Sequence, residues 1–147
     1  MVREKPLPYG ILNKIPGLLK ELGKYDELAA VYFFGSGSYG KLNPLSDLDF
    51  GILIHRNVDS ELLFKMELKF RGILSNILET DEFDLVLLNT APARFAYNII
   101  AKGNLILCKN DIQVIDFIEL TNKTFLDFKY FKDEFNIEFQ RRIGLTV

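Results

Sequence analysis

Runs of apolar residues predict four strands along the chain. Residues 28–34 are almost entirely apolar, which is typical of a strand covered on both faces of its sheet. A loop rich in small and turn-forming residues leads to a second strand, which extends from about Asp47 to Ile54. Residues 83–88 (FDLVLL) predict a third strand, and residues 105–108 predict a short strand that could lie at an edge of the sheet.

The second strand has an acidic face and an apolar face. Side chains two positions apart share one face of a strand, so Asp47 and Asp49 project together. The apolar side chains that project from the opposite face are Leu48, Phe50, Ile52 and Ile54. The pattern therefore predicts a pair of carboxylates on a strand whose other face is buried.

Apolar residues at helical spacing predict two helices in the first half of the chain. The first is expected to open at Ile15–Pro16 and to end at Gly23, as a left-handed C-cap residue. The second is expected over residues 60–79, with Asn57 or Asp59 as its cap.

The second half of the chain is expected to be mainly helical. Asn89 or Thr90 is expected to cap a helix that runs to Gly103. Residues 111–143 contain no Gly or Pro, and they predict one long helix or two stacked helices broken near Asn122.

Together these elements predict an α/β (α+β) fold, in which helices flank a small mixed sheet. Because a helix connects the second strand to the third, parallel or mixed pairing is expected within one sheet. The 147 residues are expected to form a single domain over residues 1–147, with a core at about 28–107 and a helical C-terminal region at about 111–143.

Composition and charge narrow the function classes. With 48% hydrophobic and 26% charged residues the chain is typical of a globular protein, and its formal net charge of −2 gives no general field for a long nucleic acid. The single cysteine, Cys108, excludes a disulfide within the chain and is expected to be a small buried residue. Without a recognisable signal peptide or a long apolar span, we expect a cytoplasmic protein that does not associate with membranes.

Three acidic positions carry the candidate chemistry. Asp47 and Asp49 repel each other, and a half-buried strand carries such a pair at a cost unless a cation neutralises it. The expected partner is a hard divalent ion, which prefers oxygen ligands. Asp84 is a charged residue in an otherwise apolar strand, so it is expected at a strand end that faces solvent or a site.

Gly35 and Ser36 precede the acidic pair at a defined spacing. Alone, a Gly-Ser pair is most often only a turn, and Asp-Leu-Asp is most often a solvated strand end. A much more specific combination is formed when both occur in this order on apolar strands. Here Gly35-Ser36 is followed by ten residues, then by Asp47-x-Asp49, and later by Asp84. Together these residues indicate an active or formerly active site.

This combination resembles the signature of the nucleotidyltransferase superfamily that includes DNA polymerase beta, and the chain's size resembles the minimal branch of that superfamily. The resemblance covers about residues 28–107. From Asp84 through NTAP to GNLI, the sequence is also similar to minimal nucleotidyltransferases that act as antitoxins beside helical HEPN ribonucleases. The resemblance implies a polymerase beta-like fold and Mg²⁺-dependent transfer of AMP from ATP to a hydroxyl, with a tyrosine of a HEPN toxin as the acceptor.

The resemblance also implies the site residues. The carboxylates implied as catalytic groups and as ligands of two Mg²⁺ ions are Asp47, Asp49 and Asp84, the last also as the proton acceptor. Gly35 would let the backbone approach the phosphates of ATP, and the Ser36 hydroxyl would donate to them. Lys41 is either a further cation for the nucleotide or a solvated loop lysine.

The sequence departs from the family pattern at one position. Many minimal members carry Arg directly after Gly-Ser, where this chain has Gly37. Because Arg can donate two hydrogen bonds to phosphate and Gly cannot, either Lys41 substitutes for it or nucleotide binding is weaker. The only histidine, His55, could approach the site, but a surface or strand-end position is the simpler interpretation.

The C-terminal region is unusually rich in phenylalanine. Four of these residues fit one helical stripe: Phe128, Phe131, Phe135 and Phe139. The stripe could contact a partner, cover the sheet as core or form the seam of a homo-oligomer. Partner contact supports an alternative function, a catalytically weak or inactive antitoxin that neutralises its partner by direct binding. Transfer to a small molecule such as an antibiotic is a third interpretation, which would normally need an additional pocket-forming domain.

Overall fold

A computed structural model describes residues 11–35 and 48–144 of the chain. The elements in order are η1 (Ile11–Lys14), α1 (Ile15–Leu22), β1 (Leu28–Phe34), β2 (Asp49–Ile54), α2 (Ser60–Leu78), β3 (Asp84–Leu87), α3 (Ala93–Lys102), β4 (Asn104–Cys108) and α4 (Asp111–Arg142). The strands and α-helices are those that the sequence pattern predicts, and the short 3₁₀ helix η1 is an addition.

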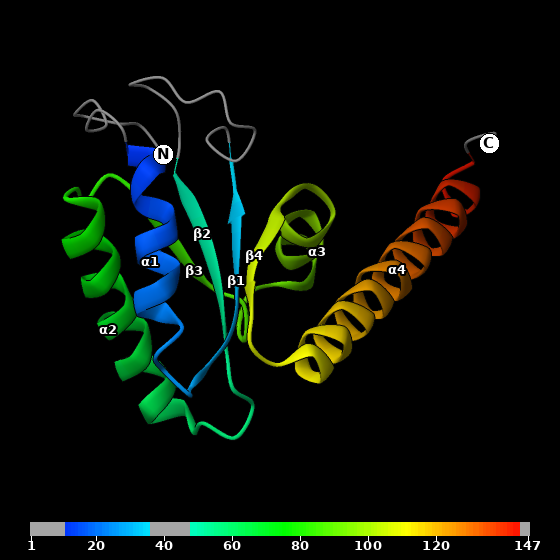
Figure 1. Ribbon diagram of the computed structural model, residues 1–147. Helices are drawn as coiled ribbons and strands as arrows, with labels where there is room; N and C mark the ends of the chain where they lie inside the picture. The colour runs from blue at the N-terminus through cyan, green and yellow to red at the C-terminus, as the bar shows by residue number, and fades with distance from the viewer. Residues whose placement is uncertain (1–10, 36–47, 145–147) are drawn as a thin grey trace.

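The four strands form one mixed sheet in the order β3-β2-β1-β4. Strand β1 pairs antiparallel with β2 and β4, whereas β2 and β3 pair in parallel. Helices α1 and α2 cover one face of the sheet, and α3 lies on the other side, between the sheet and α4 (Figure 1). The predicted mixed sheet flanked by helices and the edge position of β4 are confirmed.

Each face of the sheet has its own apolar cluster. The predicted apolar face of β2 is fully buried: Leu48, Phe50, Ile52 and Ile54 pack with residues of α1 and α2. The cluster on the opposite face includes Tyr32 and Leu53 from the sheet and Ile99 and Val114 from α3 and α4. Strand β1 is therefore covered on both faces over most of its length, which explains its nearly continuous apolar sequence.

The C-terminal ends of α1 and α2 differ from the sequence expectation. Gly23 follows α1 in a right-handed conformation (φ −63°), so the expected left-handed cap is wrong there. Glu79, directly after α2, is instead left-handed (φ 56°). Its carboxylate lies 2.6 Å from Lys14 Nζ, and this hydrogen bond lowers the pKa of Glu79.

Asp59 caps α2 as expected, because its side chain accepts a 2.8 Å hydrogen bond from Leu62 N. The corresponding prediction for Asn89 or Thr90 is wrong, since Pro92 occupies the N-cap position of α3. The Asn89 amide instead continues the β2–β3 ladder: Oδ1 accepts from Ile54 N at 2.8 Å, and Nδ2 donates to Ile54 O at 2.7 Å.

The Asn89 amide is expected to stabilise the sheet. In Asn89→Ala, the buried Ile54 N–H loses its acceptor, which should lower the free energy of unfolding by about 1–3 kcal/mol. Asn136→Ala, at an exposed position on α4, is the matched control and should change it by less than about 0.5 kcal/mol. Urea denaturation measures both, and equal midpoints for the two variants would contradict this role.

Cys108 is exposed rather than buried, which corrects the sequence expectation. It ends the edge strand β4, where a side chain can face solvent. Its thiol donates a 3.0 Å hydrogen bond to Asp111 Oδ1, and this bond raises the pKa of Cys108.

Helix α4 is one continuous helix of 32 residues, which confirms the first of the two alternatives and excludes a break near Asn122. Asn110 caps it by accepting a 3.0 Å hydrogen bond from Gln113 N. Its first half packs beside α3, and its second half projects away from the sheet (Figure 1). Among the described residues, no helix is both long and apolar enough to cross a membrane.

Candidate functional site

Two of the three predicted acidic residues meet at one end of the sheet. Asp49 is the first residue of β2, Asp84 is the first residue of β3, and the two are direct partners in the parallel ladder. The register is fixed by the backbone, since Asp84 N donates a 2.9 Å hydrogen bond to Leu48 O. Neighbouring strands lie about 4.8 Å apart, so the two residues are adjacent.

The two carboxylates also lie on the same face. The next pair in the ladder, Phe50 and Leu85, belongs to the cluster under α1 and α2. Because side chains alternate along a strand, Asp49 and Asp84 project from the opposite face, on the side of α3. Both are partly buried. The expectation that Asp84 lies at a strand end is confirmed.

Gly35 lies directly against this acidic pair. It follows β1 with φ +82°, a conformation that favours glycine. Its neighbour Phe34 is the ladder partner of Asp49, and a Cβ placed on Gly35 would overlap the Asp49 carboxylate. The glycine thus lets the backbone approach the carboxylate more closely than any other residue could.

The remaining predicted site residues, Ser36, Lys41 and Asp47, lie outside the described residues, as does Gly37. Within residues 11–35 and 48–144, no three His, Cys, Asp or Glu side chains gather to hold a metal ion. The roles of all six site residues therefore remain predictions.

His55 lies away from the acidic pair. It follows the last residue of β2, whereas Asp49 is the first, which separates them by roughly 20 Å at about 3.3 Å per residue. Its Nδ1 accepts a 3.2 Å hydrogen bond from Asn57 N. The strand-end interpretation of His55 is confirmed.

The structure also places two aromatic residues near the site, and sequence reasoning did not single out either of them. The ring of Phe34 contacts that of Phe95 on α3 edge-on, with centroids 6.2 Å apart. Phe34 could have been found from its place directly before Gly35. Phe95 is distant in sequence, and only the packing of α3 brings it here. Phe34 is thus an apolar ladder partner of Asp49, and Phe95 packs against its ring.

The site and fold define a class of protein, the nucleotidyltransferases. Residues 17–112 match the family described as "Polymerase beta, Nucleotidyltransferase". Since this match spans most of the chain, the chain belongs to that family, and the expected polymerase beta-like fold is confirmed. Among curated proteins, no sequence match was found.

Several solved structures that match this fold are of toxin–antitoxin proteins. A toxin–antitoxin with AMP-PNP matches with a TM-score of 0.61 and 22% identity, over 87% of this chain and 97% of that chain. A structure of a tri-AMPylated HEPN toxin of Shewanella oneidensis in complex with an MNT antitoxin matches with a TM-score of 0.56 and 19% identity, over 88% of this chain and 96% of that chain. A third structure is of a toxin–antitoxin MntA–HpeT mutant, in which two aspartates that lie two positions apart are replaced by glutamate. It matches with a TM-score of 0.58 and 21% identity, over 87% of this chain and 97% of that chain.

Proposed function

We propose that this chain transfers AMP from ATP to a hydroxyl group, and that the acceptor is a tyrosine of a HEPN-type toxin, which is thereby silenced. The observation that carries the proposal is the pairing of Asp49 with Asp84 beside Gly35 at one end of the sheet. The AMP-PNP complex and the tri-AMPylated toxin among the similar structures support ATP as substrate and a protein as acceptor.

The described carboxylates fit a divalent metal site. Asp49 and Asp84 are neighbours on one face of the sheet, and carboxylate oxygens are the ligands that Mg²⁺ prefers. We propose that they and Asp47 hold two Mg²⁺ ions. Bound there, these ions would neutralise charge on the entering and leaving oxygens of the transfer.

The proposed reaction exchanges one phosphorus–oxygen bond for another. The acceptor hydroxyl oxygen bonds to the α-phosphorus of ATP, the bond from that phosphorus to the bridging oxygen of the β-phosphate breaks, and pyrophosphate leaves. Asp84 accepts the proton of the hydroxyl. Asp49 and Asp47 would hold the metal ions, which would supply positive charge for the triphosphate.

The nucleotide-binding residues in this proposal are Gly35, Ser36 and Lys41. The positive φ of Gly35 and its close approach to Asp49 allow backbone groups to face the phosphates. Lys41 supplies the positive charge that an Arg at the position of Gly37 would otherwise provide. We further propose that residues 1–147 act as one domain, in the cytoplasm, where ATP is abundant.

Labelled ATP tests this function. A HEPN-type toxin incubated with the chain and Mg²⁺ should acquire label from α-³²P-ATP and none from γ-³²P-ATP, because AMP is transferred and pyrophosphate is released. EDTA should abolish the labelling. Transfer of the γ label would instead identify a kinase and contradict the proposal.

A second candidate function is neutralisation of the toxin by binding alone. It is favoured by the exposure of Phe128, Phe131 and Phe135 on α4, which contradicts the interpretation of this stripe as core covering the sheet. If Asp47→Asn protects cells from the toxin as well as the unmodified chain, binding is sufficient. If protection is lost while the complex persists, AMP transfer is required.

A further inference from the structure

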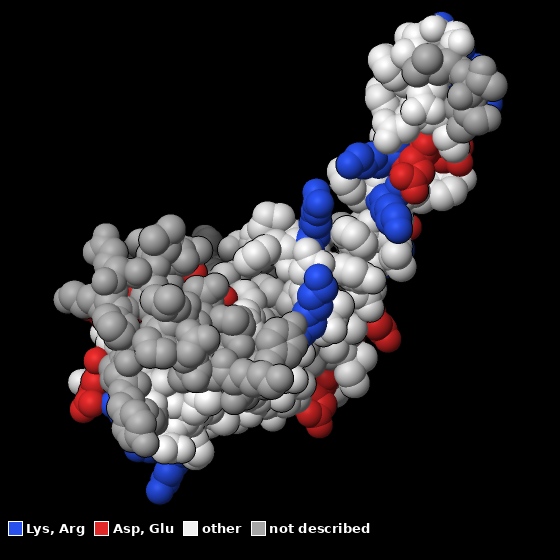
Figure 2. All heavy atoms as spheres, turned by 90° about the horizontal axis from the view of Figure 1, so that it is seen from above, with Lys and Arg blue, Asp and Glu red and all other residues white. Residues whose placement is uncertain are grey.

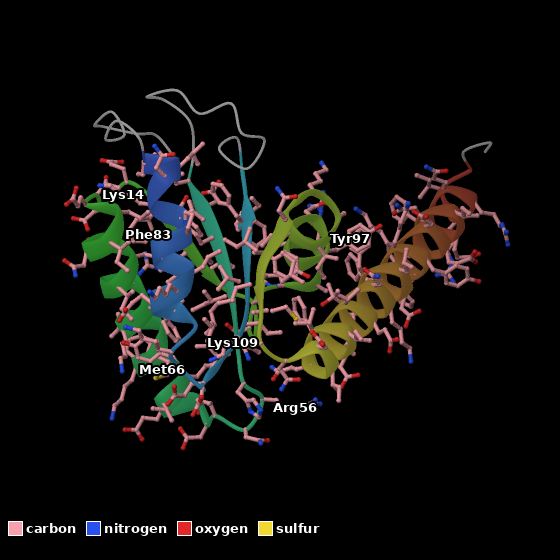
Figure 3. The ribbon with its side chains drawn as sticks, viewed as in Figure 1. Lys14, Arg56, Met66, Phe83, Tyr97 and Lys109 are labelled. Carbon is pink, nitrogen blue, oxygen red and sulfur yellow. The ribbon has the colours of Figure 1, made fainter. Side chains whose placement is uncertain are left out.

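One apolar stripe runs along the whole of α4, but only its first half is covered. In the first half, Val114 and Thr121 are buried against the rest of the domain. At the middle of the helix, the Phe125 ring stacks on Tyr97 of α3 at 4.2 Å, and Tyr97 points from α3 toward α4 (Figure 3). The same face continues past this contact through Phe128 and Phe135, whose side chains are 60% and 61% exposed. The stripe therefore extends beyond the surface that α3 provides.

The projecting half has apolar residues on its other side as well. Leu126, Tyr130 and Ile137 recur at spacings of four and seven, and all three are exposed. Tyr130 is two positions from Phe128, which places these residues on nearly opposite faces of the helix. A helix that is apolar on two sides is typical of one surrounded by other helices.

The exposed area is large enough for a specific interface. Phe131 and Phe139 are 71% and 52% exposed. With aromatic side chains of roughly 200 Å², the projecting half presents on the order of 800 Å² of mostly apolar side chain, which equals one partner's share of a standard protein–protein interface.

The charges on this half of α4 favour a protein as its partner. Residues 126–143 carry four basic residues (Lys129, Lys132, Arg141, Arg142) and four acidic ones (Asp127, Asp133, Glu134, Glu138), so their net charge is zero. Figure 2 shows both signs interspersed with uncharged surface on the projecting part. Such a surface does not attract a nucleic acid or an anionic membrane, but it suits the mixed surface of a helical protein.

The direction of α4 relates this surface to the candidate site. The helix starts near the end of the sheet opposite Asp49 and rises until its C-terminal end is level with the end that carries Asp49 and Asp84 (Figure 1). A protein bound along the projecting half would thus be held on the side of α3, toward the same end of the molecule as the acidic pair.

We infer that residues 125–143 of α4 insert between helices of the acceptor protein and dock it for AMP transfer. The inference rests on the proposed function for the identity of that protein, a HEPN-type toxin. The face that carries Phe128 and Phe135 contacts one helix of the acceptor, and the face that carries Leu126, Tyr130 and Ile137 contacts another. The helices of the acceptor thus bury the part of the α4 stripe that lies beyond the contact of Phe125 with α3.

The double variant Phe131→Ala, Phe135→Ala tests the docking. Binding to a separately purified HEPN-type toxin, measured by isothermal titration calorimetry, should weaken by at least about 100-fold, because two central aromatic contacts are lost. Phe64→Ala is the matched control: Phe64 is 61% exposed on α2, on the opposite side of the sheet, and its loss should leave binding unchanged. The circular dichroism and melting temperature of both variants should match those of the unmodified chain.

A kinetic measurement separates docking from chemistry. The Phe pair should raise KM for the toxin and leave kcat unchanged, whereas Asp49→Asn should abolish transfer and still bind the toxin. If Asp49→Asn transfers AMP normally, the proposed function fails while the docking result stands. Unchanged binding by the Phe pair, or no binding by the unmodified chain, overturns the inference. Self-association of the unmodified chain that the Phe pair abolishes would assign the surface to a second copy and also overturn it.

Discussion

Replacing Asp49 with Asn is expected to reduce AMP transfer by at least about 10²–10³-fold. The substitution keeps the size of the side chain but removes a charge from the pair formed with Asp84. An amide is a weak ligand for Mg²⁺, and loss of electrostatic stabilisation at a transferred phosphoryl group costs several kcal/mol. Steady-state transfer with saturating ATP and toxin measures the effect.

The fold should survive this change. Asp49 lies at the start of its strand and is partly buried, and removing one charge also relieves repulsion between neighbouring carboxylates. We therefore expect a melting temperature within a few degrees of the original. Asp116→Asn, which removes an exposed carboxylate paired with Arg56, is the control and should retain full transfer. Equal activities of the two variants would remove Asp49 from the site.

Replacing Gly35 with Ala should impair both stability and transfer. The positive φ of Gly35 costs an Ala about 1–2 kcal/mol, and the new Cβ would overlap the Asp49 carboxylate. The carboxylate must then move, and a displacement of about 1 Å in a catalytic group can cost roughly 10²-fold in rate. Thermal unfolding and transfer assays should therefore both show a loss.

Gly72→Ala provides the matched comparison. Gly72 lies within α2, and a Cβ there would have no neighbour within 4 Å. Since Ala favours helix over Gly, this variant should gain about 0.5–1 kcal/mol in stability with unchanged transfer. If Gly35→Ala behaves like Gly72→Ala, the close approach of Gly35 to Asp49 is not required.

The sequence predicts elements whose burial pattern is unambiguous. The bounds of β1 follow from a continuous apolar run, because both faces of this strand are covered. Asp59 was one of two possible caps for α2 together with Asn57, and the structure shows that Asp59 is the one used. Asn89 shows the limit of such reasoning. An Asn before a helix can cap it or pair with a strand, and the choice depends on Ile54, 35 positions earlier in the chain.

The sequence predicts which carboxylates the candidate site contains, but not how they are arranged. Spacing identifies Asp49 and Asp84 as acidic residues on two strands, but their pairing depends on how α2 returns the chain to the sheet. Likewise, the Phe stripe of α4 indicates a face to be buried without identifying what buries it. The exposed position of Cys108 reflects the open edge of β4, which sequence alone does not orient.

The most direct test of the account is the intact mass of a HEPN-type toxin after incubation with this chain, ATP and Mg²⁺, beside the same reaction with Asp47→Asn. The account predicts that the toxin gains whole AMP units, located on tyrosine by peptide mapping, with the unmodified chain only. A toxin of unchanged mass that still forms a stable complex with the chain would contradict AMP transfer and leave an antitoxin that acts by binding alone.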